Sequence, residues 1–534
     1  MNKTTSLILI LIVFLGGFLR IFNLSNSPPS LNWDETALGY NAYSISETLR
    51  DEYGKVLPIF TRSFDDYKSA IPVYLLLPSI KIFGLNEFGV RFPSAFLGVV
   101  SIVLVFLITK SLFKDSKAAL ASSFVFAIEP WSVHFSRVLH EANIALFFLL
   151  LGFLFFLYSL KKSILLIPSI AFFGLSNYTY HSNKLIVPLF FLALIVIHHK
   201  RFAKYSKKII LTSLFTLTVF MVPFVILIFA GQVFARATST NIFILWPKSG
   251  NVLEKLYYFF WELGGRYLAY FSPPNLFIRE PQEPSTIVSG NSIFYPFEFI
   301  PWIIGLSYLV IHLKKNKELT ALLLLSPLPA ILTWNWFQPA RTMSLFVLFS
   351  ILIGLGIVKM FDYFSHKFEL KAKLYIKSVL FFTFAVYGLV SALYLFDSIN
   401  VQLPERDAGN WQPGFKETVP VVMELEKDYG QVIIETSHAQ PYIFYLFYGK
   451  YSPEKYLMEL DLEKIGTPRK TYDFGKFKFR KIYWPEDKSL KNTLFVGSEE
   501  SLPQNDIETQ KGAKAVGAIK DRWGRTGHKL VATE

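Results

Sequence analysis

The sequence predicts a polytopic α-helical membrane protein with about eleven transmembrane helices, followed by a small extracytoplasmic α/β domain. Its composition is the first reason: 52% of the 534 residues are hydrophobic and only 18% are charged, with a mean hydropathy of +0.37. Soluble proteins carry roughly 25% charged residues. The second reason is that the basic residues behind the net charge of +14 lie in short tracts between apolar segments. That pattern indicates membrane topology, and we expect no nucleic-acid partner.

The apolar segments divide the chain into a membrane module, residues 1–396, and an extracytoplasmic domain, residues 397–534. No small-residue cleavage site follows the first segment, which favours an uncleaved helix over a signal peptide. The expected spans are 6–22, 92–113, 118–133, 142–160, 164–178, 185–198, 209–230, 297–313, 319–334, 342–360 and 374–396. The chain has no cysteine, which excludes disulfides, thiolate metal sites and cysteine nucleophiles.

Basic residues on alternate loops predict the orientation. Lysines and arginines are frequent around 110–117, 161–162, 200–208, 314–317 and 359–377, and the positive-inside rule makes these segments cytoplasmic. A plasma-membrane protein with a cytoplasmic N-terminus and an extracytoplasmic C-terminal domain is therefore expected.

Two predicted outer loops are long, residues 23–90 and 231–296, and loops of this length are usually functional. The first should contain an amphipathic helix at the membrane interface over 36–49 and a short apolar stretch, 71–83, that does not span. The second contains an amphipathic aromatic stretch over 253–270. In the C-terminal domain we expect a helix at 415–429, strands at 432–436 and 494–496, and a short aromatic helix or strand at 441–448.

The outer loops collect carboxylates and isolated cations, with Asp34 and Glu35 directly after the first span. A carboxylate can deprotonate an acceptor hydroxyl, while Lys and Arg can neutralise a departing phosphate. The pattern suits a reaction on an anionic lipid-linked substrate at the outer face. The sequence has neither a Walker loop nor a dinucleotide fingerprint, so no soluble nucleotide is expected.

Several segments resemble a known family. The runs Trp33-Asp34-Glu35, Asp66-Tyr67-Lys68 and 83–95 are similar to the first outer loop and second helix of C-type (GT-C) glycosyltransferases. Within these, the similarity is to the protein O-mannosyltransferase and lipid A aminoarabinose transferase group. Segments 129–137 and 326–341 resemble later landmarks, so the resemblance covers about residues 1–360.

The resemblance implies an inverting transferase that uses a polyprenyl-phosphate-linked sugar. Asp34 matches the family's acidic residue, the proposed base, and Lys68 matches a Lys-Pro-Pro lysine that contacts the donor phosphate. Here Ser69 and Ala70 replace the two prolines. Arg137 and Arg341 are candidate phosphate contacts by position. The sugar and the acceptor, whether lipid, protein or polysaccharide, stay open.

Each candidate has a structural alternative. Asp34 could instead cap the following helix, and Glu35 could be a helix-start charge or an orienting partner. Arg137, Lys184 and Arg341 could anchor to lipid head groups. The other candidate substrate-site residues are Asp66, which also suits a solvated turn, His140 with Glu141, which are too few for a metal site although a divalent cation stays possible, His181 and Lys184.

Two other function classes compete with a transferase. A transporter or flippase of lipid-linked sugars would also be polytopic, but transporters place charges near the bilayer midplane. Here the charges gather at one face, which favours surface chemistry. A non-catalytic membrane protein that binds glycans is the third possibility.

Overall fold

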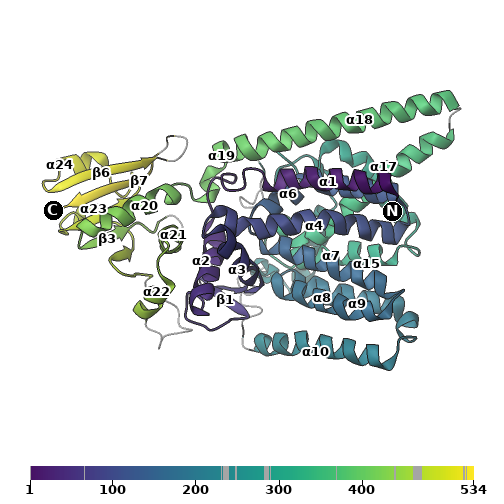
Figure 1. Cartoon of the computed structure of the whole chain (residues 1–534), viewed down its shortest axis with the longest axis horizontal. Coiled ribbons are helices and arrows are strands. Elements are labelled where there is room, and N and C mark those ends of the chain that lie inside the picture. Colours follow the sequence, from purple (N-terminus) through teal and green to yellow (C-terminus); the bar gives the residue numbers. More distant parts are fainter. Residues whose placement is uncertain are drawn as a thin grey trace. The chain divides into compact units, whose positions relative to one another are not determined.

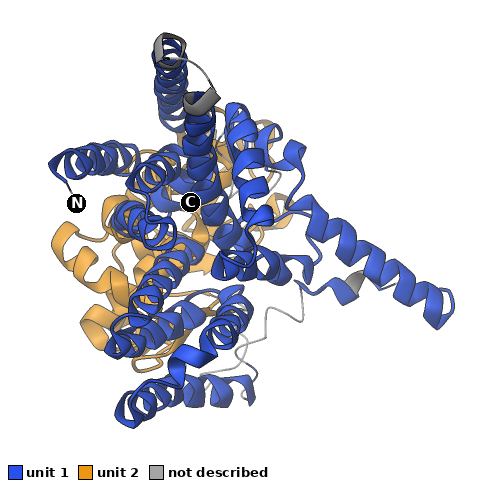
Figure 2. Cartoon of the chain, turned by 90° about the vertical axis from the view of Figure 1, so that its right-hand side faces the viewer, with its two compact units in different colours: residues 1–22, 94–402 blue, residues 23–93, 403–534 orange. Residues whose placement is uncertain are grey.

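The computed structural model describes residues 2–534 except 65, 230, 232–239, 247–248, 282–287, 289, 368–369, 438–439, 461–471, 521–523 and 525. The chain forms two compact units (Figure 2). Unit 1 comprises Met1–Phe22 and Ser94–Gln402, and unit 2 comprises Asn23–Pro93 and Leu403–Glu534. The segment after the first helix thus belongs with the C-terminal segment, whereas the sequence suggested one division near residue 397.

Unit 1 is a bundle of apolar helices (Figure 1). Its main helices are α1 (Lys3–Ile21), the larger part of α4 (Glu87–Phe113), α5 (Ser116–Ile128), α6 (Pro130–Arg137), α7 (Glu141–Ser159), α8 (Leu166–Thr179), α9 (Asn183–Phe202), α10 (Lys207–Phe229), α12 (Val252–Ala269), α13 (Pro273–Phe277), α14 (Phe299–Ile311), α15 (Lys317–Leu325), α16 (Leu328–Ile331), α17 (Met343–Lys367) and α18 (Leu370–Asp397).

The chain crosses a membrane several times. Within the described residues, seven helices are long and apolar enough to span, namely α1, α4, α7, α9, α10, α17 and α18. The expected spans near α5, α8 and α14 form shorter apolar helices. The expected span 319–334 is wrong as one continuous helix, because it divides into α15 and α16. Pro327 and Pro329 lie at this break, and proline has no backbone N–H to continue a helical ladder.

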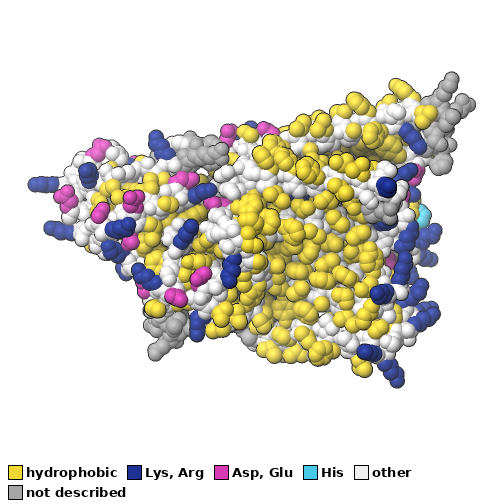
Figure 3. All heavy atoms as spheres, in the orientation of Figure 1, with side chains coloured by type: hydrophobic (Ala, Val, Ile, Leu, Met, Phe, Trp, Pro, Cys, Tyr) yellow, Lys and Arg dark blue, Asp and Glu magenta, His cyan; other side chains and the backbone are white. Residues whose placement is uncertain are grey.

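The lysine-rich connections of unit 1 share one end of the bundle. The segments 114–115, 160–165, 203–206 and 312–316 join consecutive helices at the end where α1 begins. Figure 3 shows Lys and Arg side chains along this end and a broad hydrophobic surface on the helices beside it. This separation is what a bundle needs when its middle is in hydrocarbon and one end meets a head-group layer.

Helices α14 and α17 cross at very short range in unit 1. A methyl group on Gly305 would overlap the backbone carbonyl of Leu352, and one on Gly356 would overlap that of Pro301. Small residues of this kind let two membrane helices approach closely.

Adding a side chain at this crossing should destabilise unit 1. We expect Gly305→Val to lower the thermal unfolding midpoint in detergent, because backbone atoms of α17 would have to move. Gly264→Val is a suitable control, since a side chain there would meet no neighbour within 4 Å. Equal midpoints for the two variants would contradict this close packing.

Unit 2 begins with α2 (Trp33–Thr48), the antiparallel hairpin β1 (Phe60–Ser63) and β2 (Asp66–Ser69), and α3 (Ile71–Phe83). Its C-terminal helices are α19 (Leu403–Arg406), α20 (Phe415–Leu425), α21 (Pro441–Tyr448), α22 (Pro453–Glu459), α23 (Trp484–Asp487) and α24 (Gln504–Thr509). A five-stranded sheet of order β4-β3-β5-β7-β6 completes the unit. Its strands are β3 (Gln431–Ile434), β4 (Phe477–Phe479), β5 (Thr493–Gly497), β6 (Ala513–Lys520) and β7 (Thr526–Thr533).

The sheet is mixed, with β3 parallel to both β4 and β5, and β7 antiparallel to β5 and β6. A core that includes Ile433, Trp484, Phe495 and Val531 packs against it. The predicted strands near 432–436 and 494–496 are present as β3 and β5, and the predicted helix near 415–429 is present as α20.

Helix α2 is buried by protein on most of its surface. It packs against α3, α21 and α22, and the ring of Phe447 reaches Gly39 so closely that a side chain there would collide with it. The expectation of an amphipathic helix lying on a membrane is therefore wrong, because partners from far along the sequence cover its polar face as well.

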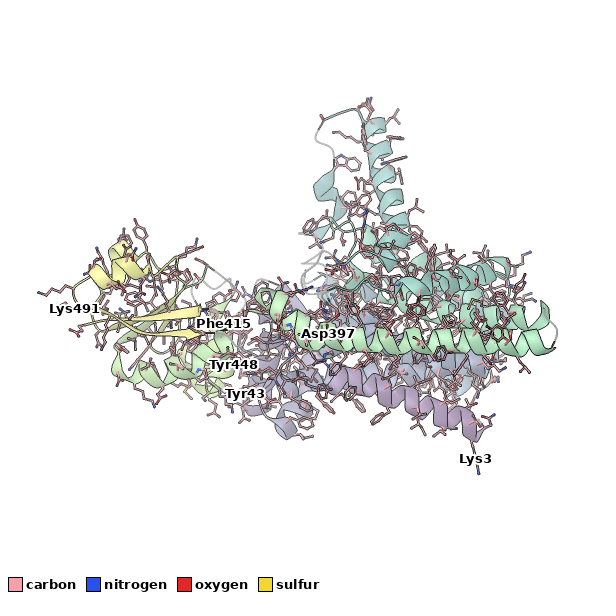
Figure 4. The ribbon with its side chains drawn as sticks, turned by 90° about the horizontal axis from the view of Figure 1, so that it is seen from above. Lys3, Tyr43, Asp397, Phe415, Tyr448 and Lys491 are labelled. Carbon is pink, nitrogen blue, oxygen red and sulfur yellow. The ribbon has the colours of Figure 1, made fainter. Side chains whose placement is uncertain are left out.

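The aromatic run 441–448 was predicted to be either a short helix or a strand, and it forms the helix α21. Its residues are almost all buried, and Phe444 stacks on Phe415 of α20 with ring centroids 4.4 Å apart. Figure 4 labels Phe415 and Tyr448, and Tyr43 of α2 beside them. The aromatic side chains thus form core around α2 and do not cover a membrane surface.

Candidate functional site

Asp34 stands in the first turn of α2, and a neighbouring residue caps that helix. The Asn32 side chain accepts a hydrogen bond from Glu35 N at 2.8 Å, and Glu35 Oε2 accepts one from Asn32 N at 3.2 Å. This reciprocal pair is a capping box. Asn32 is therefore the N-cap, so the alternative that Asp34 caps the helix is wrong. The positive end of the helix still favours an anion at Asp34.

The Asp34 carboxylate forms an ion pair with Lys68. Lys68 lies on β2, opposite Thr61 of β1, so the hairpin register carries its ammonium group to α2. The Lys68 side chain is 6% exposed, while the Asp34 side chain is 46% exposed. The structure thus joins two residues of the predicted site in a pair with a buried cation and an accessible carboxylate.

Glu35 has a different environment from its neighbour. Its side chain is fully buried and receives two hydrogen bonds from Arg91, from Nε to Oε1 at 3.0 Å and from a terminal nitrogen to Oε2 at 3.1 Å. Bidentate arginine–carboxylate pairs are among the strongest side-chain contacts. Adjacent helical residues point about 100° apart, which is why Asp34 can face outward while Glu35 faces the core.

Arg91 also holds the segment that precedes α2. Its guanidinium donates to the backbone carbonyls of Leu24, Pro28 and Ser30 at 3.2, 2.8 and 2.6 Å. It lies 6.0 Å from the Trp411 ring centroid. Sequence reasoning did not select Arg91 as a partner of Glu35. The available signal was a lone arginine at the start of an apolar helix, because a charge in such a place usually has a use.

The C-terminal segment of unit 2 contributes to the same structure. The Gln412 side chain accepts a hydrogen bond from Trp33 N at 3.1 Å. Glu87, in the first turn of α4, accepts hydrogen bonds from Tyr448 at 3.2 Å and from Lys416 at 3.0 Å. Burial raises the pKa of the Tyr448 phenol, so it remains protonated and can donate. The C-terminal segment thus bonds to the start of α2 through Gln412 and to the start of α4 through Lys416 and Tyr448.

The two predicted arginines lie in unit 1 and differ in burial. Arg137 ends α6, is 2% exposed and donates to the carbonyls of Leu19 and Phe22, at 2.9 and 2.8 Å, where α1 ends. Those bonds satisfy carbonyls at a helix end, which is a structural role for Arg137. Arg341 is half-buried and donates to Asn335 Oδ1 at 3.4 Å.

The predicted residues of the 140 and 181 loops lie together in unit 1. His140 caps α7 by accepting a hydrogen bond from Ala142 N at 3.1 Å, and its ring lies 5.6 Å from that of Tyr180. Lys184 Nζ is 3.3 Å from His181 Nδ1 and is 9% exposed. Glu141 follows in the first turn of α7. A lysine with so little exposure does not anchor to lipid head groups.

The remaining predictions are Asp66 as a substrate-site residue and a possible divalent cation. The backbone of Asp66 pairs with Ser63 in the hairpin, and its side chain is outside the described part of the chain. In that described part, no three His, Asp or Glu side chains gather closely enough to hold a metal ion. We therefore assign no metal ligands.

Comparison with known proteins extends this picture. The profile of the dolichyl-phosphate-mannose-protein mannosyltransferase family matches residues 68–226. "Putative mannosyltransferase YkcB" of Bacillus subtilis (strain 168) is 27% identical over 179 residues, which are 32% of this chain and 23% of that protein. The match thus spans less than a quarter of this relative.

Solved structures match over nearly the whole chain. ArnT from Cupriavidus metallidurans bound to undecaprenyl phosphate superposes with a TM-score of 0.54 at 12% identity, covering 99% of this chain and 98% of ArnT. The apo state of the same protein gives 0.57 at 10% identity, covering 98% and 97%. The chain has the fold of a GT-C glycosyltransferase.

The GT-C fold confirms the fold class that the sequence predicted, with a helical membrane module and a small C-terminal sheet region. The family profile begins at Lys68 and therefore includes that residue, α4 and the 140 and 181 loops. Asp34, Glu35 and Arg341 lie outside the matched range, so their roles depend on the geometry described above.

Proposed function

We propose that this chain is a membrane glycosyltransferase that moves a sugar from a polyprenyl-phosphate donor to an acceptor hydroxyl, with inversion at the anomeric carbon. The observation that carries the proposal is the Asp34–Lys68 pair, an accessible carboxylate beside a buried cation at the start of α2. The fold shared with ArnT, whose structure is bound to undecaprenyl phosphate, supports a lipid-phosphate donor.

In the proposed reaction Asp34 is the general base. The acceptor oxygen attacks the anomeric carbon and loses its proton to the Asp34 carboxylate, while the bond between the sugar and the phosphate oxygen breaks. The polyprenyl phosphate leaves with the bonding electron pair. A carboxylate that is half exposed can reach an incoming hydroxyl, which the buried Glu35 cannot do.

Lys68 has the complementary role in this proposal. An ammonium group has three N–H donors, so Lys68 can keep its contact with Asp34 and also donate to a phosphate oxygen. Its burial strengthens an interaction with the charge that develops on the leaving phosphate. Arg341 and Arg137 stay predicted phosphate contacts, with Arg137 already bonded to the end of α1.

We place the reaction on the extracytoplasmic face of the plasma membrane, because the positive-inside rule makes the lysine-rich connections cytoplasmic and the first span then carries the segment with Asp34 to the outer side. The direct test is reconstitution of the full chain in liposomes with radiolabelled undecaprenyl-phosphate-mannose, undecaprenyl-phosphate-glucose or undecaprenyl-phosphate-aminoarabinose, together with membrane extract as the source of acceptor. We expect loss of label from one of these lipids and its appearance on an acceptor. Movement of intact labelled lipid across the bilayer, without cleavage, would identify a flippase instead.

Lys68→Ala should weaken donor use more than acceptor use. A lost charge-assisted hydrogen bond is worth about 1.5–3 kcal/mol, so we expect the donor KM to rise by roughly 10- to 150-fold and the acceptor KM to change little. Lys55→Ala is the control, because Lys55 is an exposed lysine of unit 2 in the segment between α2 and β1. An equal rise of both constants would remove the phosphate role of Lys68.

A further inference from the structure

Unit 1 contains a second candidate site, a cleft of about 700 Å³ between the end of α12, the segment 272–281 and the loop 334–337. Ligand sites commonly measure roughly 300–1,000 Å³. The side chains that matter for its chemistry are two indoles, two amides, one cation and one anion: Trp334, Trp336, Asn275, Asn335, Arg279 and Glu280.

The wall that carries the indoles is rigidly built. Arg266 is 3% exposed and donates to the carbonyls of Thr333, Trp334 and Asn335 at 3.0, 3.1 and 2.8 Å. In addition, Trp334 N donates to the Thr240 carbonyl at 2.9 Å. The backbone of the loop is therefore bonded to two separate partners, which keeps the position of its side chains.

Trp336 is held in one orientation. Its ring lies so near to α12 that a methyl on Gly265 would be 3.1 Å from its Cη2 atom, and the Arg266 guanidinium is 5.1 Å from its centroid. Yet Trp336 is 49% exposed and Trp334 is 50% exposed. A large apolar ring that is fixed on one side and open on the other is suited to receive a flat ligand.

The charge of the cleft argues against a phosphate as its ligand. Among the described residues, its lining includes one cation, Arg279, and one anion, Glu280. Arg266 does not line the cleft: its Nη1 donates to the three carbonyls and its Nε to Glu262 at 3.0 Å. A neutral ligand with many hydroxyl groups fits this balance, because amides, carboxylate and guanidinium all hydrogen-bond to hydroxyls.

We infer that this cleft binds the pyranose ring of a neutral sugar, with the C–H face of the ring against Trp336 or Trp334. Sugar C–H groups carry slight positive charge and the face of an indole is negative, so the two surfaces attract. The inference deepens the proposed function, since it names a sugar subsite of the transferase. Asn335, which accepts a hydrogen bond from Arg341, connects the cleft to a predicted phosphate contact.

Saturation-transfer NMR on the full chain in detergent tests this subsite without any need for transfer activity. The probes are the methyl α-pyranosides of mannose, glucose and galactose, and we expect saturation of the ring C–H protons of at least one of them. At least one of Trp336→Leu and Trp334→Leu, the one that removes the stacking indole, should weaken that signal by tenfold or more. Two variants are used because either one could disturb the loop.

Trp261→Leu is the matched control, because Trp261 lies on α12, is 69% exposed and is not among the residues that line the cleft. It should bind the pyranosides like the unaltered chain. Signals that are absent from the unaltered chain, or lost equally in all three variants, would overturn the subsite and leave the indoles as interfacial anchors.

Competition identifies the source of the sugar. Displacement of the bound pyranoside by undecaprenyl-phosphate-mannose, but not by undecaprenyl phosphate, would assign the subsite to the donor. Displacement by soluble oligosaccharide alone would assign it to the acceptor. If pyranosides bind while no lipid-linked sugar is consumed, the subsite stands and the proposed transferase function fails.

Discussion

Asp34→Asn is expected to lower the rate of sugar transfer by about 10²- to 10⁴-fold, the usual contribution of a general base. Asparagine has nearly the same shape and keeps a hydrogen-bond acceptor for Lys68, but it cannot take a proton from the acceptor hydroxyl. The measurement is kcat with saturating labelled donor and acceptor. The donor KM should not rise, because Lys68 remains available for the phosphate.

Two controls separate chemistry from folding. Glu47→Gln removes an exposed carboxylate from the last turn of the same helix and should leave kcat unchanged. The Asp34→Asn chain should also keep its thermal unfolding midpoint, because the Asn32–Glu35 capping box that starts α2 is intact. Transfer at the original rate by the Asp34→Asn chain would show that another group is the base.

Arg91→Met is expected to destabilise unit 2 by about 3–5 kcal/mol, the cost of leaving a buried charge without its partner. The Glu35 carboxylate would remain fully buried, and the carbonyls of Leu24, Pro28 and Ser30 would lose their common donor. The measurement is the thermal unfolding midpoint of the full chain in detergent. Transfer activity should fall as well, since the start of α2 carries Asp34.

Lys478→Met provides the comparison, because Lys478 forms an ion pair with Asp473 in the same unit and the two side chains are 46% and 26% exposed. Exposed pairs contribute roughly 0–1 kcal/mol, so this variant should be nearly as stable as the unaltered chain. The double variant Glu35→Gln/Arg91→Met should recover part of the lost stability, because it leaves no buried charge. A double variant that is less stable than Arg91→Met would contradict the assignment.

Much of the helical architecture could be predicted because membrane spans depend on local composition. A run of about 20 apolar residues is enough to define one, and the predicted spans over α1, α4, α7, α9, α10, α17 and α18 are present as long helices. The wrong prediction of one continuous helix over 319–334 also has a local cause. Two prolines change the average hydropathy of the segment little, but they interrupt the backbone hydrogen bonds of the helix.

The C-terminal sheet was harder to predict. Strands β3 and β5 are fully or nearly buried and read as apolar runs, whereas most residues of β6 alternate between exposed and half-buried. Exposed edge strands have weak apolar patterns, so the sequence predicted β3 and β5 but not the edge strand β6.

The candidate site, like the fold, could be predicted only in part. Sequence alone selected Asp34, Glu35 and Lys68, because acidic and basic residues in an apolar chain need a use and because their order resembles a known family. It assigned Asp34 and Glu35 different roles, a base and a helix-start charge or orienting partner, but it could not show that Glu35 meets the core while Asp34 stays accessible. It also missed Arg91, whose partner lies 56 residues away.

A polytopic membrane protein with acidic and basic groups near its first helix could thus be predicted from composition and residue order alone. The burial of α2, the pairing of Glu35 with Arg91 and the accessible Asp34 carboxylate beside Lys68 became visible in the folded chain. This division arises because hydrophobicity and charge are properties of single segments. Burial and ion pairing depend on which distant segments meet, and here the C-terminal segment supplies the core around α2.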